Sequence, residues 1–275
     1  MNRPAAVTRR LWFGLNPELR KSRFHTQKGQ YNCRAPLEML RSATSKWPFP
    51  RGSSRLSAAL SAMLLRGAPP TLLAKVGAGS CVTAYSREEL GNPVFWQLYE
   101  RPLRKFLRSF LRPGDVFVDI GAHRGWHATY ALGLVSPEGA VIACEPFPAH
   151  AQHLRAIAHL NPGHRLFVEE VAVGRQEGYE ELLTSLADDS IHTLIPEFTS
   201  RSVSERRAVR VATTTLDRVF EKYRHVTERR TQPTVVLKID VEGAELDVLL
   251  GGAGHPDGVS QGRSRGNYWR VRAVG

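Results

Sequence analysis

The stretch Asp119-Ile120-Gly121-Ala122-His123-Arg124-Gly125 is the part of this chain from which its fold class follows. It comes after the apolar run Val116-Phe117-Val118 and leads into an apolar-periodic segment, residues 126–134. This order predicts a buried strand, a tight glycine turn and a helix. Asp119 then stands at the carboxyl end of a strand, beside a helix N-terminus. Open α/β sheets bind nucleotide-like ligands at such a place.

The segments that follow continue this alternation of strands and helices, which favours an α/β fold. Apolar runs without polar interruptions are typical of parallel strands that helices cover on both faces. The predicted strands are residues 116–120, 140–144, 166–168 and 234–239. The predicted helices are 124–134, one beginning at Pro148, 216–223 and 244–250, with Thr215 as a cap. Residues 176–209 are expected to be an insertion with little regular structure beyond one hairpin.

The glycines of the first turn indicate the kind of ligand. Gly121 and Gly125 permit a close backbone approach, but the three-glycine pattern that cradles a dinucleotide pyrophosphate is absent, since His123 and Arg124 stand between them. The carboxylate of Asp119 also suits a positively charged ligand group better than a phosphate.

A second carboxylate, Glu145, follows the second strand, 26 residues after Asp119. At that position a carboxylate can accept the hydroxyl protons of a ribose. The two acids together indicate a nucleoside that carries a cationic amino-acid arm, as S-adenosyl-L-methionine does. The alternative is a βαβ unit whose loops carry incidental acids.

Ionisable residues crowd the end of the last predicted strand, in Lys238-Ile239-Asp240-Val241-Glu242-Gly243-Ala244-Glu245. Strand alternation places Lys238 and Asp240 on one face, and a lysine within an apolar strand is expected to be paired. Asp240 or Glu242 is the candidate general base for a hydroxyl nucleophile. Complementation of the helix dipole is the alternative role, and no metal site is predicted.

These segments resemble the FkbM family of S-adenosylmethionine-dependent methyltransferases. The resemblance covers roughly residues 90–252 and rests on the motifs 113–122, Cys144-Glu145-Pro146 with Pro148, Val171-Ala172-Val173-Gly174, Thr215-Leu216-Asp217 and 237–245. It implies a Rossmann-like class I methyltransferase fold and O-methylation of a hydroxyl on a glycan or natural product. It also implies that Asp119 and the turn Gly121–Gly125 hold the methionine part, Glu145 the ribose, and Val171 and Ala172 the adenine.

The chain departs from the family pattern in two places. His123 stands where the family usually has Asn, so a catalytic role for His123 or His127 is open beside the blander role of a loop or packing residue. After Gly251-Gly252 the chain is rich in Gly, Ser and Arg, and only residues 269–274 could form an apolar strand. We therefore expect the C-terminal strands of the family's sheet to be missing.

Charge is distributed unevenly along the 275 residues. Residues 1–112 contain 20 Lys and Arg against 5 Asp and Glu, whereas residues 113–250 contain 14 against 20. The expected division is an irregular basic leader (1–52), a helical extension (53–112), the methyltransferase core (113–252) and a disordered tail (253–275). Because the core is net acidic, nucleic acid is not expected as a partner, and no membrane partner is expected either. A small-molecule or glycan acceptor is what the family resemblance implies.

Within the extension, residues 94–111 have helical periodicity, which Pro102 is expected to split or kink. The basic residues Arg101, Arg104, Lys105 and Arg108 are expected to form its solvated face. The three cysteines, far apart and without a CxxC pair, fit a reducing compartment, and no apolar run is long enough to span a membrane. A cytoplasmic location follows as an expectation.

Two other functions remain open from the sequence. The atypical C-terminus is compatible with a non-catalytic remnant of a methyltransferase. The basic N-terminal region is compatible with an RNA-binding methyltransferase, although its Lys and Arg lack interleaved aromatic residues.

Overall fold

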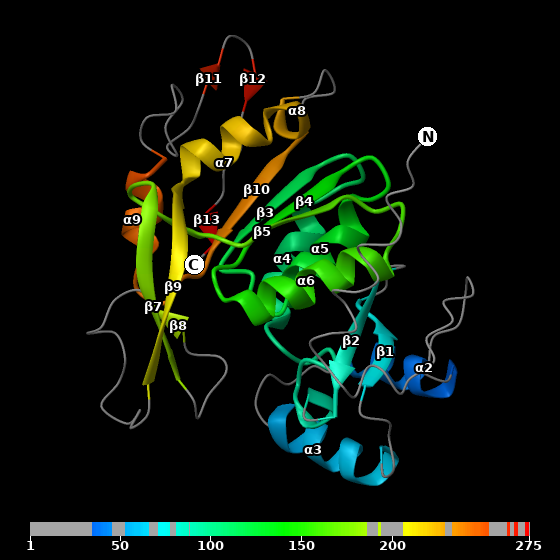
Figure 1. Cartoon of the computed structure of the whole chain (residues 1–275). Coiled ribbons are helices and arrows are strands. Elements are labelled where there is room, and N and C mark those ends of the chain that lie inside the picture. The colour runs from blue at the N-terminus through cyan, green and yellow to red at the C-terminus, as the bar shows by residue number, and fades with distance from the viewer. Residues whose placement is uncertain are drawn as a thin grey trace, which may run out of the picture. The chain divides into compact units, whose positions relative to one another are not determined.

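Five parallel strands form the main sheet in a computed structural model of the chain (Figure 1), in the order β13-β10-β3-β4-β5. They are β3 (Val116–Ile120), β4 (Ala140–Cys144), β5 (Leu166–Glu169), β10 (Val235–Ile239) and β13 (Ala273–Val274). The structure describes residues 35–45, 53–65, 71–77, 81–87, 89–185, 192–193, 206–228, 233–252, 263–264, 267–268 and 273–274. The predicted mixed α/β fold with a parallel sheet is confirmed.

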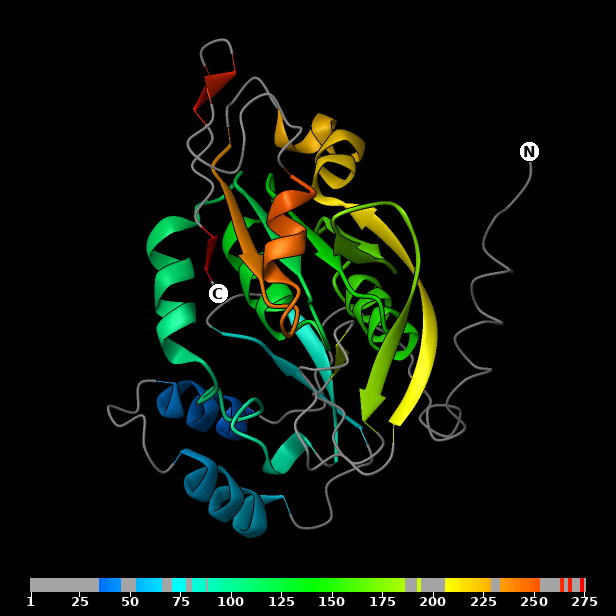
Figure 2. The same ribbon diagram turned by 90° about the vertical axis from the view of Figure 1, so that its left-hand side faces the viewer.

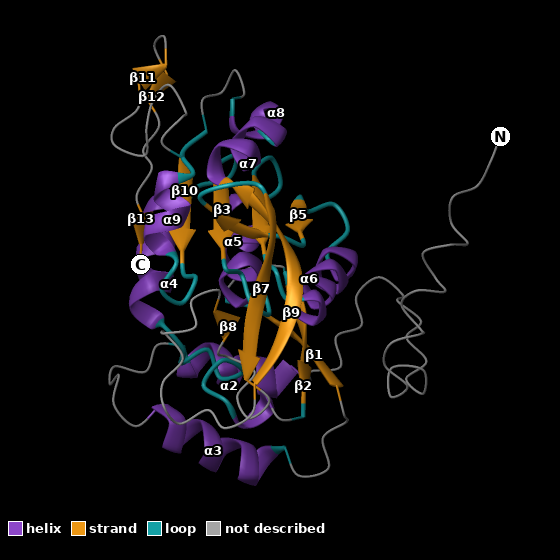
Figure 3. Cartoon of the chain, turned by 60° about the vertical axis from the view of Figure 1, so that its left-hand side comes forward, coloured by secondary structure: helices purple, strands orange, loops and turns teal. Residues whose placement is uncertain are grey.

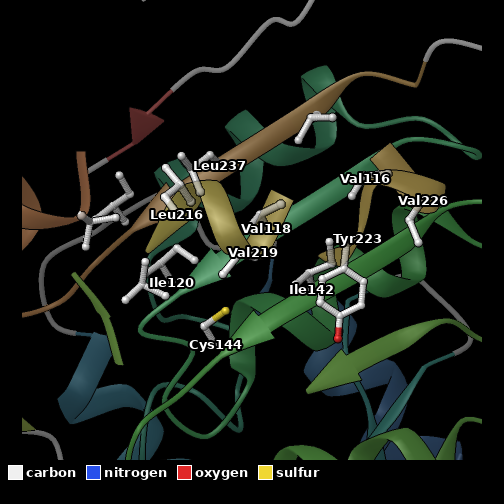
Figure 4. Packing of buried hydrophobic residues seen from close by; sticks show 14 of the residues in the cluster. Val116, Val118, Ile120, Ile142, Cys144, Leu216, Val219, Tyr223, Val226 and Leu237 are labelled. Atoms are coloured by element: carbon white, nitrogen blue, oxygen red, sulfur yellow. The ribbon is translucent and has the colours of Figure 1, made fainter. Parts of the chain in front are cut away.

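Alternate residues of β3 point into two separate cores. Val116, Val118 and Ile120 pack with Leu216 of α7 (Leu216–Lys222) and with side chains of two further helices (Figure 4). Those helices are α8 (Arg224–Thr227) and α9 (Glu245–Leu250). Phe117 packs on the opposite face with α4 (Arg101–Phe110), α5 (Trp126–Val135) and α6 (Pro148–Leu160). The uninterrupted apolar strands follow from this double coverage.

The predicted bounds of the four strands and of the helices after them agree with the structure to within two residues. Pro148 begins α6 as expected, since proline fits the first turn of a helix. The hydroxyl of Thr215 accepts a hydrogen bond from the Arg218 N–H (3.2 Å), so the predicted cap of α7 is also confirmed.

A second, four-stranded sheet follows β5 and has the order β6-β9-β7-β8. Its strands are β6 (Ala172–Gly174), β7 (Gly178–Ser185), β8 (His192–Thr193) and β9 (Arg206–Thr215). β7 and β9 pair antiparallel along their length, and Figure 3 shows them as two long neighbouring strands. The predicted hairpin is present, but β9 extends past residue 209 as far as the cap of α7.

The segment before β3 differs from its prediction in two respects. Residues 94–100 are turns, and a single helix, α4, begins at Arg101 with Pro102 in its first turn, where the missing N–H costs no hydrogen bond. The prediction of a solvated Arg104 is also wrong. Arg104 is buried, and its guanidinium carbon lies 5.7 Å from the ring centre of Trp126 and 5.6 Å from that of Tyr130.

The N-terminal part forms a compact unit of its own, which contains α2 (Ala35–Thr44), α3 (Ser53–Leu64) and the strand pair β1 (Thr71–Lys75) and β2 (Val82–Ser86). The sequence predicted neither α2 nor this strand pair. Arg41 is fully buried and donates to the carbonyl oxygens of Phe95 (2.7 Å) and Lys75 (3.0 Å) and to Glu38 (2.9 Å). Arg41, one of the basic residues of the predicted leader, therefore contributes to the structure of this unit.

Most of the predicted tail lies outside the described residues, as do residues 1–34. Within the described tail, β13 pairs parallel with β10 through Leu237 and Lys238, and β11 (Arg263–Ser264) pairs antiparallel with β12 (Asn267–Tyr268). The missing family strands and the four domain boundaries stay predictions. Across the described ranges, every helix is too short or too polar to cross a bilayer.

Candidate functional site

The candidate site lies where the strand order of the main sheet changes direction. From β3 the chain proceeds to β4 and β5 on one side, and then returns to β10 on the other side of β3. Ligands of open parallel sheets bind at the carboxyl ends of the strands at such a switch point. Asp119 and Lys238 occupy paired positions of β3 and β10, and Glu145 follows β4 directly. The topology thus brings these predicted residues to one edge of the sheet.

The glycine turn after β3 has a backbone that other residues could not easily adopt. Gly121 has φ +76°, and a Cβ there would lie 1.9 Å from the Asp240 carbonyl oxygen. Gly125 has φ +78°, and a Cβ there would lie 2.4 Å from the Leu154 side chain. The N–H groups of Gly121 and Ala122 donate to the Cys144 carbonyl oxygen (3.0 and 3.1 Å). The turn is therefore fixed against both neighbouring strands.

Asp119 and Lys238 form a buried ion pair at the centre of the site. Lys238 Nζ lies 3.1 Å from Asp119 Oδ1 and 3.2 Å from Asp240 Oδ2, so the predicted pairing of Lys238 is confirmed. Burial lowers the pKa of Lys238, but the charges of Asp119 and Asp240 outweigh it and raise this pKa above its usual value. Among the residues that the structure describes, none donates a hydrogen bond to the buried Oδ2 of Asp119.

An orphaned carboxylate oxygen of this kind is unusual, because burying an acceptor without a partner costs about 1–3 kcal/mol. The Asp119 carboxylate can still accept a hydrogen bond from a ligand. A protonated amine is a suitable donor, because it also adds a favourable charge interaction. The acceptor oxygen of Asp119 therefore fits the cationic arm that is expected from the sequence.

Glu145 is buried, and backbone groups hold both of its carboxylate oxygens. Oε2 accepts a hydrogen bond from the His123 N–H (2.7 Å), and Oε1 accepts one from the Phe147 N–H (2.9 Å). Burial raises the pKa of Glu145, but the adjacent His150 and the two N–H groups outweigh it and lower this pKa. Each carboxylate oxygen has two lone pairs, so each retains one for a hydroxyl donor.

A group of histidines borders Glu145, and only His123 among them was singled out from the sequence. His150 Nδ1 lies 3.7 Å from Glu145 Oε1, and the His123 and His150 ring centres are 4.0 Å apart. His153 lies one turn further along α6. Burial, and then the positive Arg124 and the two other histidines, lower the pKa of His153 to about 3. The spacing of His150 and His153 just after Pro148 was the signal available in the sequence.

His123 itself has φ +50°, a left-handed conformation in which Asn, Asp and His are enriched among residues other than glycine. His127, the other histidine considered for catalysis, is buried on α5, and its Nε2 lies 2.7 Å from Glu100 Oε2. That contact joins α5 to the residue before α4.

The two candidate bases differ in environment. The Asp240 side chain is 56% exposed and contacts Lys238. Glu242 lies two residues on, with φ +47°. Burial, followed by the negative charges of Asp240 and Glu245, raises the pKa of Glu242. A carboxylate of raised pKa is the better proton acceptor near neutral pH.

Val171 and Ala172 lie just after β5. Ala172 is buried in a small apolar cluster with Leu182 and Val211, against which Phe147 packs. Val171 packs against the core cluster of β3 and α7. The Glu145 N–H donates to the Glu169 carbonyl oxygen (2.9 Å), which holds the ends of β4 and β5 together. The predicted adenine side of the site is thus an apolar neighbour of the Glu145 loop.

The family model of the methyltransferase FkbM domain matches residues 119–265, more than half of the chain. The chain belongs to this family. Its matched region begins at Asp119 and contains every residue proposed above for the site. The family resemblance that the sequence motifs indicated is thereby confirmed.

Comparison with solved structures finds the crystal structure of methyltransferase FkbM from Methylobacillus flagellatus KT, with 16% sequence identity and a TM-score of 0.31. The match covers 62% of this chain and 41% of that chain, so the likeness extends over less than half of the solved protein. No curated protein sequence matches the chain. Within the described ranges, no cluster of three or more His, Cys, Asp or Glu side chains could hold a metal ion.

Proposed function

We propose that this protein is an S-adenosylmethionine-dependent O-methyltransferase whose acceptor is a hydroxyl of a glycan or a natural-product-like small molecule. Family membership supports methyl transfer. The observation that carries the choice of cofactor is the buried Asp119 Oδ2, an acceptor without a donor among the described residues, at the switch point of the sheet.

The residues present fit such a cofactor. Asp119 Oδ2 would accept a hydrogen bond from the amine, while Lys238 Nζ donates a hydrogen bond to Oδ1. Glu145 would accept the ribose hydroxyls with the lone pairs that the His123 and Phe147 N–H groups leave free. S-adenosylmethionine would supply an activated methyl group bound to a positively charged sulfur.

The acceptor hydroxyl requires a group that takes its proton. Glu242 is the better candidate of the two acids after β10, because its raised pKa brings it closer to neutral pH. Asp240 contacts Lys238 and would mainly position that lysine. Most of the rate enhancement would come from holding the hydroxyl in line with the methyl group.

Calorimetry with S-adenosylhomocysteine tests the cofactor assignment without knowledge of the acceptor. We expect the wild-type protein to bind this product and Asp119→Asn to bind it at least about tenfold more weakly. Glu169→Gln is the matched control, because it neutralises a carboxylate at the end of β5, which lies two strands away from β3 in the same sheet. No binding by a wild-type protein that melts cooperatively would contradict the proposal.

A further inference from the structure

The segment of α4 and the two residues after it, 101–112, contains five Lys and Arg and no acidic residue. Arg101, Lys105 and Arg108 follow one another at spacings of four and three, so they project within about 60° of arc on one side of the helix. Lys105, Arg108 and Arg112 are exposed and Arg101 is half-buried. We call these four residues the α4 basic face.

The opposite side of α4 packs against the core, so the basic face points away from the core. Leu107 and Leu111 are buried in the core with Phe117, and Phe106 and Phe110 pack against the same cluster. Figure 2 shows α4 on the outer side of the unit that contains the main sheet. The aromatic residues of α4 therefore belong to its core side, and the basic face presents only cationic heads and their alkyl stems.

Several other exposed basic side chains of this unit have acidic partners. The ion pairs Arg155–Glu170 (2.6 Å), Arg175–Asp247 (2.8 Å) and Arg224–Glu228 (3.6 Å) are examples. In contrast, Arg101, Lys105 and Arg108 have no ion pair with any residue that the structure describes. The Arg112 guanidinium donates hydrogen bonds to carbonyl oxygens at the end of α4 and just after it, those of Arg108 (3.2 Å), Ser109 (3.1 Å) and Leu111 (2.8 Å).

We propose that the α4 basic face docks this protein on an anionic lipid surface. A group of four or more Lys and Arg on an amphipathic helix is typical of binding to acidic headgroups. Lipids are mobile and can gather beneath a convex row of charges. Single-stranded nucleic acid instead needs a groove with aromatic side chains on which bases stack, and the α4 basic face has neither.

Docking by this face would bring the candidate site to the same surface. Glu100 immediately precedes α4 and contacts His127 in the first turn of α5, so the Arg101 end of α4 lies at the carboxyl end of β3. An acceptor hydroxyl held at the headgroup layer would then be near the edge of the sheet that carries Asp119. The docking itself does not depend on the proposed function.

Vesicle co-sedimentation of the full chain tests the proposal. The vesicles are pure phosphatidylcholine or phosphatidylcholine with about 30% phosphatidylserine. Each cation near such a surface strengthens binding about fivefold, so Arg101→Gln/Lys105→Gln/Arg108→Gln should weaken binding to the acidic vesicles about a hundredfold. Lys105→Gln alone, a milder change on an exposed position, should weaken it about fivefold.

The matched control is Arg155→Gln/Arg175→Gln/Arg224→Gln, which removes the same net charge from paired positions and should change binding less than about threefold. Binding by the wild type should also fall at 0.5 M salt, because salt screens exposed charges. Equal losses in the two triple variants, or no preference of the wild type for acidic vesicles, would overturn the proposal. Tighter binding to an RNA duplex than to vesicles, lost in the α4 triple variant, would assign this face to nucleic acid instead.

Discussion

Lys238 Nζ lies 3.1 Å from Asp119 Oδ1, between neighbouring parallel strands in the core of the main sheet, and both side chains are buried. This pair fixes one carboxylate oxygen of Asp119, and the other, Oδ2, has no hydrogen-bond donor among the described residues. The strength of the pair can be tested apart from any ligand.

Lys238→Met should lower the free energy of unfolding by about 3–5 kcal/mol, because it leaves a buried carboxylate without its cation. Lys222→Met removes the exposed partner of Glu169 and should cost at most about 1 kcal/mol. Urea unfolding at pH 7 measures both. An equal decrease in the free energy of unfolding for the two variants would contradict this, because the buried ion pair would then stabilise the protein no more than the exposed one.

Glu145→Gln should destabilise the protein by about 1–3 kcal/mol at pH 7, because an amide cannot accept from both the His123 and Phe147 N–H groups. The folded pKa of Glu145 is lowered, so its contribution is present above the unfolded value of 4.5 and is lost as pH falls through the folded pKa. The difference between wild type and variant should therefore shrink below pH 4.5. Glu177→Gln, at an exposed position, serves as the control; a constant difference down to pH 3 would contradict the account.

Comparison of Gly121→Ala with Gly114→Ala separates the cost of a steric clash from the cost of backbone strain. Both glycines have positive φ, +76° and +96°, but only at Gly121 would a Cβ collide, with the Asp240 carbonyl oxygen. Gly114→Ala should cost about 1–2 kcal/mol from the left-handed conformation alone. Gly121→Ala should cost more than about 3 kcal/mol, as expected for overpacking added to strain. Thermal and urea unfolding of the pair decide the point.

The His153 imidazole should remain neutral down to about pH 5, because burial and the adjacent Arg124 lower its pKa to about 3. Its ring signals in NMR, assigned with His153→Gln, should not move between pH 8 and 5. Arg124→Gln should raise this pKa by removing one of its causes. A titration midpoint near 6.5 in the wild type would exclude the buried arrangement of the histidine group.

Local signals in the sequence were sufficient for the strand–turn–helix around Asp119, because apolar runs and glycines report on their own neighbourhood. The pairing of Lys238 could also be predicted, since a charge within a buried strand requires a partner. The burial of Arg104 could not, because it depends on Trp126 and Tyr130, which come from another helix. The strand β9 was missed in part for the same reason, as its partner β7 lies across a long connection.

The residues of the candidate site could likewise be predicted in part from the sequence, whereas their contacts could not. Asp119, Glu145 and the Lys238–Glu245 cluster could be predicted from the sequence, because each lies at or just after the carboxyl end of a predicted strand. The role of backbone N–H groups in holding Glu145, and the packing of His150 against His123, arise only when β4, the glycine turn and α6 meet.

In the proposed complex, Asp119 binds the amine of S-adenosylmethionine while Glu145 binds its ribose. The most direct measurement is calorimetric binding of S-adenosylhomocysteine and of methylthioadenosine, which lacks the amino-acid arm, to the wild type, Asp119→Asn and Glu145→Gln. We predict that Asp119→Asn weakens binding of S-adenosylhomocysteine at least about tenfold and that of methylthioadenosine less than about threefold, whereas Glu145→Gln weakens both. Equal losses of the two ligands in folded Asp119→Asn, or binding of neither ligand by the wild type, would contradict the claim.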